Sequence, residues 1–192
     1  MNIIFDLGGV LMMHNMPGCI QAFLDLMGED GMKRGLGMLP NGEGVEGSLM
    51  EKFECGEVTE REFLDGVLRY SHPGTTDADI IRAWNTMHAG IPEHLLSKVH
   101  SLAQQGHHLF VLSNNNAIHY QDIMSHYDMS CFEHMFFSHL LHTRKPQRQI
   151  YEAVCAYLRE HGLDKDETWF IDDIEANRQM GEQFGWKTAE YL

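Results

Sequence analysis

Residues 3–11 read IIFDLGGVL and place the carboxylate Asp6 directly after a run of three apolar residues. A short apolar run that ends at a polar residue is typical of a strand buried on both faces. In an open parallel sheet, ligands bind beyond the carboxyl ends of the strands. Asp6 is therefore the first candidate for a functional side chain, although a turn-capping role would explain it alone.

Three more short apolar runs predict further strands, at 109–112, 135–137 and 169–171, and a last short strand is expected near 186–189. Between them, apolar residues recur at helical spacing over 91–102 and 150–158. A last helix is predicted over 174–184, where Gly185 suits a left-handed helix end. This alternation predicts an α/β fold, with a parallel sheet of about five strands flanked by helices.

Residues 17–90 interrupt the alternation, because they contain helical patterns but no convincing strand. We predict a small helical cap at 17–90, inserted into a core formed by residues 1–16 and 91–192. Within it, residues 42–47 spell the dinucleotide-binding fingerprint GxGxxG. A genuine fingerprint follows a strand and opens a helix, whereas this one follows Pro40-Asn41 and carries two glutamates. We therefore interpret these residues as a flexible loop.

Polar residues follow each of the first four predicted strands. They are Asp6, then Ser113 and Asn114, then Arg144 and Lys145, and finally Asp172 and Asp173. Taken singly, each has an ordinary explanation as a turn residue, a helix cap or a solvated cation. Because the carboxyl ends of parallel strands meet at one edge of the sheet, carboxylates, a hydroxyl and an ammonium group are expected to converge there.

In order, the motifs FDLGGVL, LSN, RKP and FIDD resemble those of the haloacid dehalogenase (HAD) superfamily over nearly the whole chain. The resemblance implies phosphoryl transfer, and this chemistry explains the carboxylates in the set. A carboxylate can attack a phosphate ester only when a metal and a cation neutralise the phosphoryl oxygens. Asp6 and Asp173 offer the hard oxygen ligands that Mg²⁺ prefers, with Asp172 beside them and the backbone carbonyl of Gly8 as a further ligand. The resemblance therefore implies a magnesium site formed by these residues.

The remaining members of the set suit the phosphoryl group itself. The Ser113 hydroxyl and the Asn114 backbone amide are the candidates to hold phosphoryl oxygens. Lys145 supplies the positive point charge that balances the carboxylates. The resemblance implies a Rossmann-like fold and a phosphatase in which Asp6 becomes an aspartyl-phosphate that water hydrolyses.

One position departs from the usual pattern of HAD phosphatases. They carry a second aspartate, a general acid and base, two positions after the nucleophile, where this chain has Gly8. Glycine at this position resembles the bacterial α-D-glucose-1-phosphate phosphatase branch, which implies a sugar phosphate substrate. His14 is the nearest substitute acid or base, and a surface-loop histidine is the plainer interpretation. His119 could steady the loop after Ser113 or occupy an exposed helix position, and Trp84 could anchor the cap or contact substrate.

Composition restricts the partners. The formal charge of −14 on 192 residues opposes non-specific binding to nucleic acid and to anionic membranes. A cap of this size predicts a small-molecule phosphomonoester substrate, because it would exclude larger partners. We expect a monomer or a weak homodimer. Although the chain has 13 histidines, no HExxH spacing predicts a zinc site.

Cysteine usage favours a reducing compartment. The four cysteines form no CxxC pair, which fits reduced thiols. The first residues show no cationic leader or long apolar segment. We therefore expect a cytoplasmic location.

Two alternatives remain beside the phosphatase. A 2-haloacid dehalogenase-like hydrolase also lacks the second aspartate, but it needs no metal, so Asp172 and Asp173 would crowd negative charge without purpose. A HAD-fold binding module would need no nucleophile, yet the complete set of reactive groups is present.

Overall fold

A five-stranded parallel sheet forms the centre of the molecule. The computed structural model describes residues 1–42 and 44–191. The sheet has the strand order β5-β4-β1-β6-β7 and consists of β1 (Asn2–Phe5), β4 (His108–Ser113), β5 (His134–Phe137), β6 (Thr168–Ile171) and β7 (Lys187–Ala189). All neighbouring strands in it run parallel. The predicted α/β fold with a parallel sheet is confirmed.

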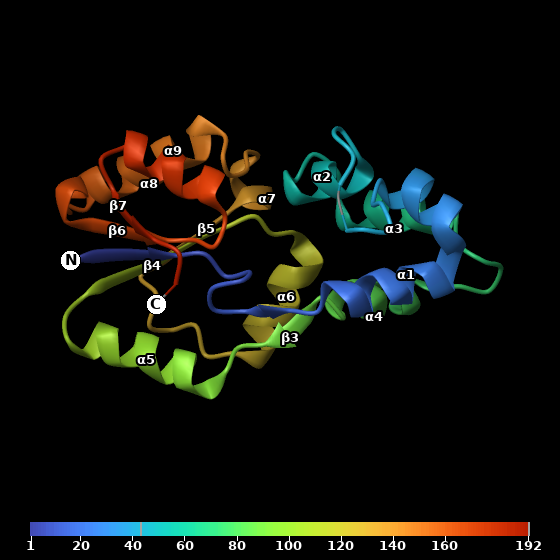
Figure 1. Ribbon diagram of the computed structural model, residues 1–192, viewed down its shortest axis with the longest axis horizontal. Coiled ribbons are helices and arrows are strands. Elements are labelled where there is room, and N and C mark those ends of the chain that lie inside the picture. The colour runs from blue at the N-terminus through green and yellow to red at the C-terminus, as the bar shows by residue number, and fades with distance from the viewer. Residues whose placement is uncertain (43, 192) are drawn as a thin grey trace.

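Helices cover both faces of this sheet, as Figure 1 shows. They are α5 (Glu93–Gln104) and α6 (Ala117–His126) on one face, with α8 (Arg148–Glu160) and α9 (Glu175–Gln183) on the other. Successive side chains of β1 point to opposite faces, so Ile3 and Phe5 pack with the first pair of helices and Ile4 packs with the second. Because both faces are covered, the inner strands β1, β4 and β6 are mainly apolar rather than alternating.

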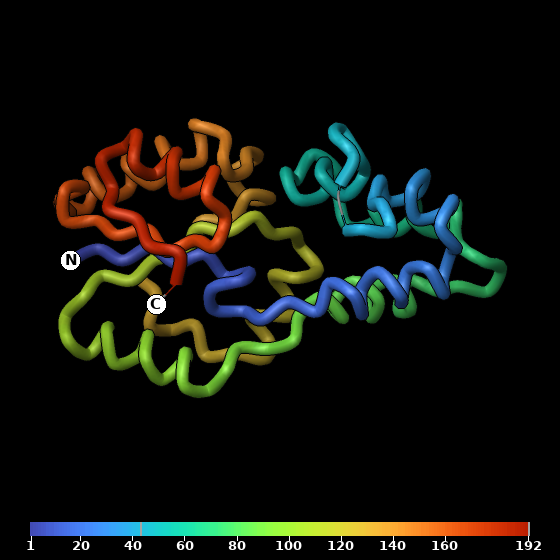
Figure 2. The backbone as a smooth tube through the Cα atoms, viewed as in Figure 1, coloured from blue at the N-terminus to red at the C-terminus, as the bar shows by residue number. Residues whose placement is uncertain are grey.

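A second helical group lies beyond the carboxyl ends of the strands (Figure 2). It comprises α1 (Met16–Gly31), the π-helical turn η1 (Met32–Leu36), α2 (Leu49–Glu54), α3 (Glu60–Leu68) and α4 (Asp77–Asn85). It has its own hydrophobic core, in which Trp84 meets Phe23 edge-on at 5.7 Å between ring centroids. Capping boxes begin α3 at Thr59 and α4 at Thr76. These caps satisfy amide groups that the first turn of a helix leaves unpaired.

The long helix α1 changes direction before it reaches η1. Gly28 has φ +65°, a left-handed conformation that side chains rarely adopt. The glycine therefore lets the chain turn back, so that η1 packs against α3.

Two short strands were not predicted from the sequence. β2 (Met13–His14) and β3 (His88–Gly90) pair antiparallel, where the chain leaves and re-enters the sheet domain. The prediction that 17–90 contains no strand is wrong at β3, because three residues are too short to show a periodic pattern. The remaining short elements are α7 (Ser138–Leu141) and η2 (Lys165–Glu167).

The GxGxxG segment does not follow a strand of the sheet. It lies between η1 and α2, where Gly44 forms an isolated bridge with Met38. Glu43, at the second position of the motif, lies outside the described residues. The surrounding chain thus lacks the strand–turn–helix context that dinucleotide binding requires. None of the described helices is both long and apolar enough to cross a bilayer.

Candidate active site

Lys145 lies between two buried carboxylates at the carboxyl ends of β1 and β6. Phe5 and Ile171 are paired in adjacent parallel strands, so the residues that follow them, Asp6 and Asp172, become neighbours. The Nζ atom of Lys145 lies 2.9 Å from Asp6 Oδ1 and 2.6 Å from Asp172 Oδ2. All three side chains are buried, and Asp172 has no exposed surface. Such burial of charge is tolerated only when the charges are paired.

Asp172 is fixed in place by hydrogen bonds to its carboxylate. The backbone amide of Ile174 donates to Oδ1 at 2.9 Å, and the Asn177 amide group donates to both oxygens at 2.9 and 3.0 Å. Asn177, in the first turn of α9, was not predicted as a site residue. Its only sequence signal is its spacing of five residues after Asp172. With Lys145 and Asn177 both bound, Asp172 is saturated with donors.

Asp173 has the opposite environment. Its Oδ1 atom is buried and has no hydrogen-bond partner among the described residues. Its carboxylate packs on the backbone of Gly9, where a Cβ atom would lie only 2.6 Å from Asp173 Cγ. Asp6, Asp172 and Asp173 each offer an oxygen within 4.8 Å of the others. An orphaned carboxylate oxygen beside two further carboxylates fits a hard divalent cation.

Burial changes the proton affinity of these carboxylates. Burial raises the pKa of Asp6 to about 6, while the Lys145 ammonium opposes this shift. Burial also raises the pKa of Asp173, with a further contribution from the charge of Asp172. Crowded carboxylates with raised pKa values are those that a cation would stabilise in the charged form.

The predicted phosphate ligands line one cavity with the carboxylates. This cavity has a volume of about 310 Å³, and its lining includes Asp6, Gly8, Ser113, Asn114, Lys145 and Asp173. The structure therefore brings the predicted site residues together, and Asp172, which is not in the lining, contacts Lys145 behind it. The Asn114 side chain holds the backbone of Lys145 with two hydrogen bonds, 3.0 Å to its carbonyl and 2.8 Å from its amide. This positioning contact was not predicted.

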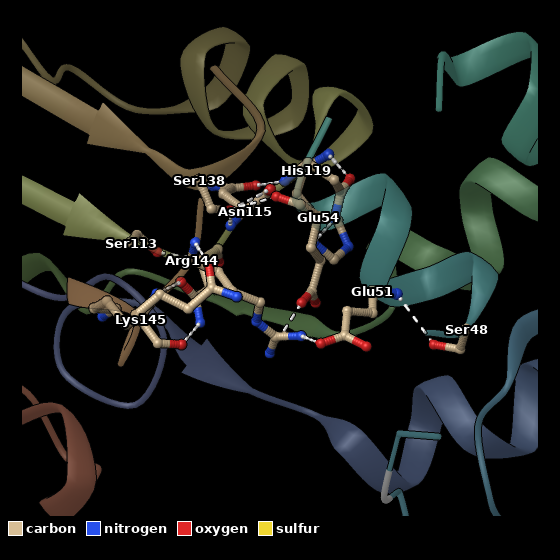
Figure 3. Close-up of polar contacts among 12 residues, drawn as sticks. Ser48, Glu51, Glu54, Ser113, Asn115, His119, Ser138, Arg144 and Lys145 are labelled. Carbon is tan, nitrogen blue, oxygen red and sulfur yellow. Dashed lines mark hydrogen bonds and ion pairs between the residues drawn. The ribbon is translucent and has the colours of Figure 1, made fainter. Parts of the chain in front are cut away.

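Lys145 reaches the site by a longer route than its motif suggested. The expectation that Arg144 and Lys145 directly follow the third strand is wrong, because α7 intervenes after β5 ends at Phe137. Arg144 turns away from Lys145 toward α2, as Figure 3 shows. Its guanidinium lies 3.2 Å from Glu51 and 3.4 Å from Glu54. Arg144 thus links the sheet domain to the helical group across the cavity.

The two histidines considered from the sequence both line the cavity. The imidazole of His14 lies against Gly8, and its Nε2 atom is 2.5 Å from the point that a Cβ atom on Gly8 would occupy. His119 is buried rather than exposed, and it hydrogen-bonds the carbonyl of Trp84 at 3.1 Å. Burial lowers the pKa of His119 to about 3, so the ring is neutral.

Trp84 anchors the helical group to the sheet domain. Its indole nitrogen donates to Asn116 Oδ1 at 3.2 Å, and its ring stacks on His119 at 5.2 Å. The side chain is 1% exposed. Of the two roles considered for Trp84, the structure shows the anchoring role.

Comparisons with known proteins place this geometry in a family. A model of haloacid dehalogenase-like hydrolases matches residues 1–185. A HAD family enzyme of Bacteroides thetaiotaomicron, solved with magnesium and inorganic phosphate, is 27% identical. The match covers 98% of this chain and 92% of that chain, with a TM-score of 0.83. A structure described as a HAD-like family hydrolase, from Porphyromonas gingivalis, is 26% identical over 98% of this chain and 89% of that chain, with a TM-score of 0.81.

More distant matches agree in fold alone. An L-2-haloacid dehalogenase is 16% identical over 97% of this chain and 82% of its own, with a TM-score of 0.56. The family model spans nearly the full length and includes every residue of the carboxylate and lysine cluster. This protein belongs to the haloacid dehalogenase-like hydrolases.

Proposed function

We propose that this hydrolase is a magnesium-dependent phosphomonoesterase with Asp6 as its nucleophile. The observation that carries the proposal is the Lys145 ammonium held between Asp6 and Asp172, beside the unpartnered carboxylate oxygen of Asp173. A dehalogenase would have no use for this accumulation of carboxylates. The magnesium and phosphate bound by the enzyme of Bacteroides thetaiotaomicron support the same assignment.

Each residue of the site has its own role in the two steps of the reaction. A carboxylate oxygen of Asp6 attacks phosphorus, and the bond from phosphorus to the ester oxygen breaks. The departing oxygen takes a proton from His14, which lines the cavity, and leaves as the alcohol. Water then attacks the phosphorus of the aspartyl-phosphate, which releases inorganic phosphate and restores Asp6. The Ser113 hydroxyl and the Asn114 backbone amide hold phosphoryl oxygens, and Lys145 neutralises charge on the same group.

The metal site is assigned from the same contacts. Asp6 and Asp173 would hold Mg²⁺ directly, together with the Gly8 carbonyl, because the donors around Asp172 already occupy its oxygens. Bound Mg²⁺ supplies positive charge to the phosphoryl oxygens, which an anionic nucleophile requires. Asp172 orients Lys145 and completes the negative charge around the cation.

Residues 17–90 would act as the cap, with the core at 1–16 and 91–192. The helical group closes one side of the cavity, which favours a small phosphorylated metabolite over a macromolecule. A sugar phosphate such as α-D-glucose 1-phosphate is the ester that the motif resemblance implies. A monomer or weak homodimer, the absence of nucleic-acid binding and a cytoplasmic location complete the proposal, and the four free thiols agree with the last of these.

Phosphate release from a panel of phosphomonoesters tests the proposal. The panel contains p-nitrophenyl phosphate and α-D-glucose 1-phosphate, each assayed with Mg²⁺ and then with EDTA. We expect release that requires the metal. Absence of release from every ester, in folded protein with Mg²⁺ present, would favour the binding-module alternative.

A further inference from the structure

The cavity has two chemically different sides. The sheet domain contributes most of the charged groups described above, whereas the helical group contributes Glu54 and four methionines. The methionines are Met16, Met38, Met50 and Met87, from α1, the loop after η1, α2 and the turn after α4. Met12, from the sheet domain, also lines the cavity, so five of the 13 methionines of the chain gather there.

Two glycines of the GxGxxG segment lie close against two of these methionines. A Cβ atom on Gly42 would lie 3.2 Å from Met16 Cγ, and one on Gly44 would lie 2.7 Å from Met50 Cε. The glycines therefore let the backbone approach the thioether side chains closely. The glycines of the GxGxxG segment are therefore explained by this packing and not by dinucleotide binding.

The charged groups on the cap side are already paired. Arg144 contacts both Glu51 and Glu54, so one guanidinium faces two carboxylates (Figure 3). The formal charge of this group is −1, which disfavours a second anion on the leaving group. His88, also in the lining, is bound through Nδ1 to Asp122 at 2.9 Å.

Among its described residues, the helical group contributes one polar side chain to the lining, Glu54, so few groups on that side can replace the water around a sugar. A polar group that is buried without a new hydrogen bond loses free energy, and a sugar has several hydroxyls. Methionine side chains, in contrast, are flexible and polarizable, and sulfur makes favourable contacts with aromatic rings.

From this lining we infer that the leaving group of the substrate is uncharged and apolar or aromatic, and that Met16, Met38, Met50 and Met87 bind it. The inference rests on the proposed phosphatase function and narrows its substrate class. It runs against the sugar phosphate that the motif resemblance implies. Apolar pockets discriminate by about 10–200-fold for one methylene and about 10²-fold against an added hydroxyl. The expected preference for an aromatic over a sugar leaving group is therefore about 10²-fold in kcat/KM.

The test compares an aromatic with a sugar leaving group, in two esters of primary alcohols, benzyl phosphate and glucose 6-phosphate. Their leaving groups have similar reactivity, so the ratio of their kcat/KM values reports on binding. We expect wild-type protein to favour benzyl phosphate. Met50→Gln keeps the length of the side chain but removes the thioether, and it should lower the ratio about tenfold. Met16→Gln provides a second variant at the start of α1.

Met124→Gln is the matched control, because Met124 on α6 is 39% exposed and lies outside the cavity lining. It should leave the ratio unchanged. A wild-type ratio of one or less, or a ratio that neither cavity variant changes, would overturn the inference while phosphatase activity stands. Absence of hydrolysis of any ester with Mg²⁺ would instead overturn the proposed function.

Discussion

The imidazole of His14 occupies the space beside Gly8 into which a side chain at position 8 would project. His14 comes from β2, the short strand that follows the first turn of the sheet domain. An aspartate at position 8 would therefore have to displace this ring. The His14 ring can lie this close to the backbone only because position 8 has no side chain.

Because His14 lines the cavity, we expect it to protonate the departing alcohol. His14→Asn should lower kcat for alkyl phosphates by about 10²–10⁴, the usual contribution of general acid catalysis. The loss for p-nitrophenyl phosphate should be smaller, since its leaving group departs without a proton. Steady-state kinetics on both esters make the comparison, with His108→Asn as control, because His108 is exposed and pairs with Glu133 at 2.7 Å. Equal losses on both esters would assign His14 a role in positioning instead.

Removal of the Lys145 ammonium should destabilise the metal-free protein. Lys145→Ala leaves Asp6 and Asp172 buried without their cation, and the loss of one partner of a buried pair costs about 3–5 kcal/mol. Thermal unfolding in EDTA should show a lower Tm. Lys165→Ala is the control, because its pair with Asp166 is exposed and such pairs contribute about 0–1 kcal/mol. An unchanged Tm in Lys145→Ala would show that the cluster is not held by this ion pair.

Magnesium should stabilise the folded protein through Asp173. A ligand at about 100 times its Kd adds about 2.7 kcal/mol, which corresponds to about 5–10 °C in Tm for a chain of this size. Asp173→Asn should lose most of this shift, because it removes the charge of the unpartnered carboxylate. Asp166→Asn, at an exposed position, should retain it. Equal Mg²⁺-induced shifts in both variants would place the metal elsewhere.

The stability of the metal-free protein should depend on pH through Asp6. Burial raises the pKa of Asp6 from 3.8 to about 6, so the folded protein binds this proton more tightly than the unfolded chain does. The stability contributed by the protonated group is fully present below pH 3.8 and is lost as pH rises through about 6. The loss is on the order of 3 kcal/mol.

The variant Asp6→Asn does not titrate at this position. Its free energy of unfolding in EDTA, measured with urea, should therefore rise relative to wild type as pH increases toward about 6. If the difference in free energy of unfolding between wild type and variant stays constant over this pH range, the raised pKa of Asp6 is contradicted.

The sheet and the set of converging polar residues could be predicted from the sequence because both follow from local patterns. Apolar runs marked the strands, and the residues after them marked the edge where ligands bind. The pairing of Arg144 with α2, the role of Asn177 and the methionines of the cavity could not be predicted. Their roles depend on contacts between segments far apart in the chain, such as the pairing of Arg144 with Glu54 across 90 residues.

His14 shows the same limit at short range. Its distance from Asp6 along the chain suggested that it could reach the site, but the pairing of β2 with β3 decides where its ring lies. β3 comes from residues 88–90, and its three residues carry no periodic signal. The position of His14 thus depends on a strand that the sequence did not reveal.

The most direct test of the mechanism is to find the phosphoryl group on Asp6. Protein that is hydrolysing p-nitrophenyl phosphate with Mg²⁺ is quenched in acid, digested and analysed by peptide mass spectrometry. We predict a phosphoryl group on Asp6 and its absence in Asp6→Asn, which should fold but show no turnover. Turnover that continues in Asp6→Asn, or steady hydrolysis by wild type with Asp6 unmodified in every quenched sample, would contradict the assignment of Asp6 as the nucleophile.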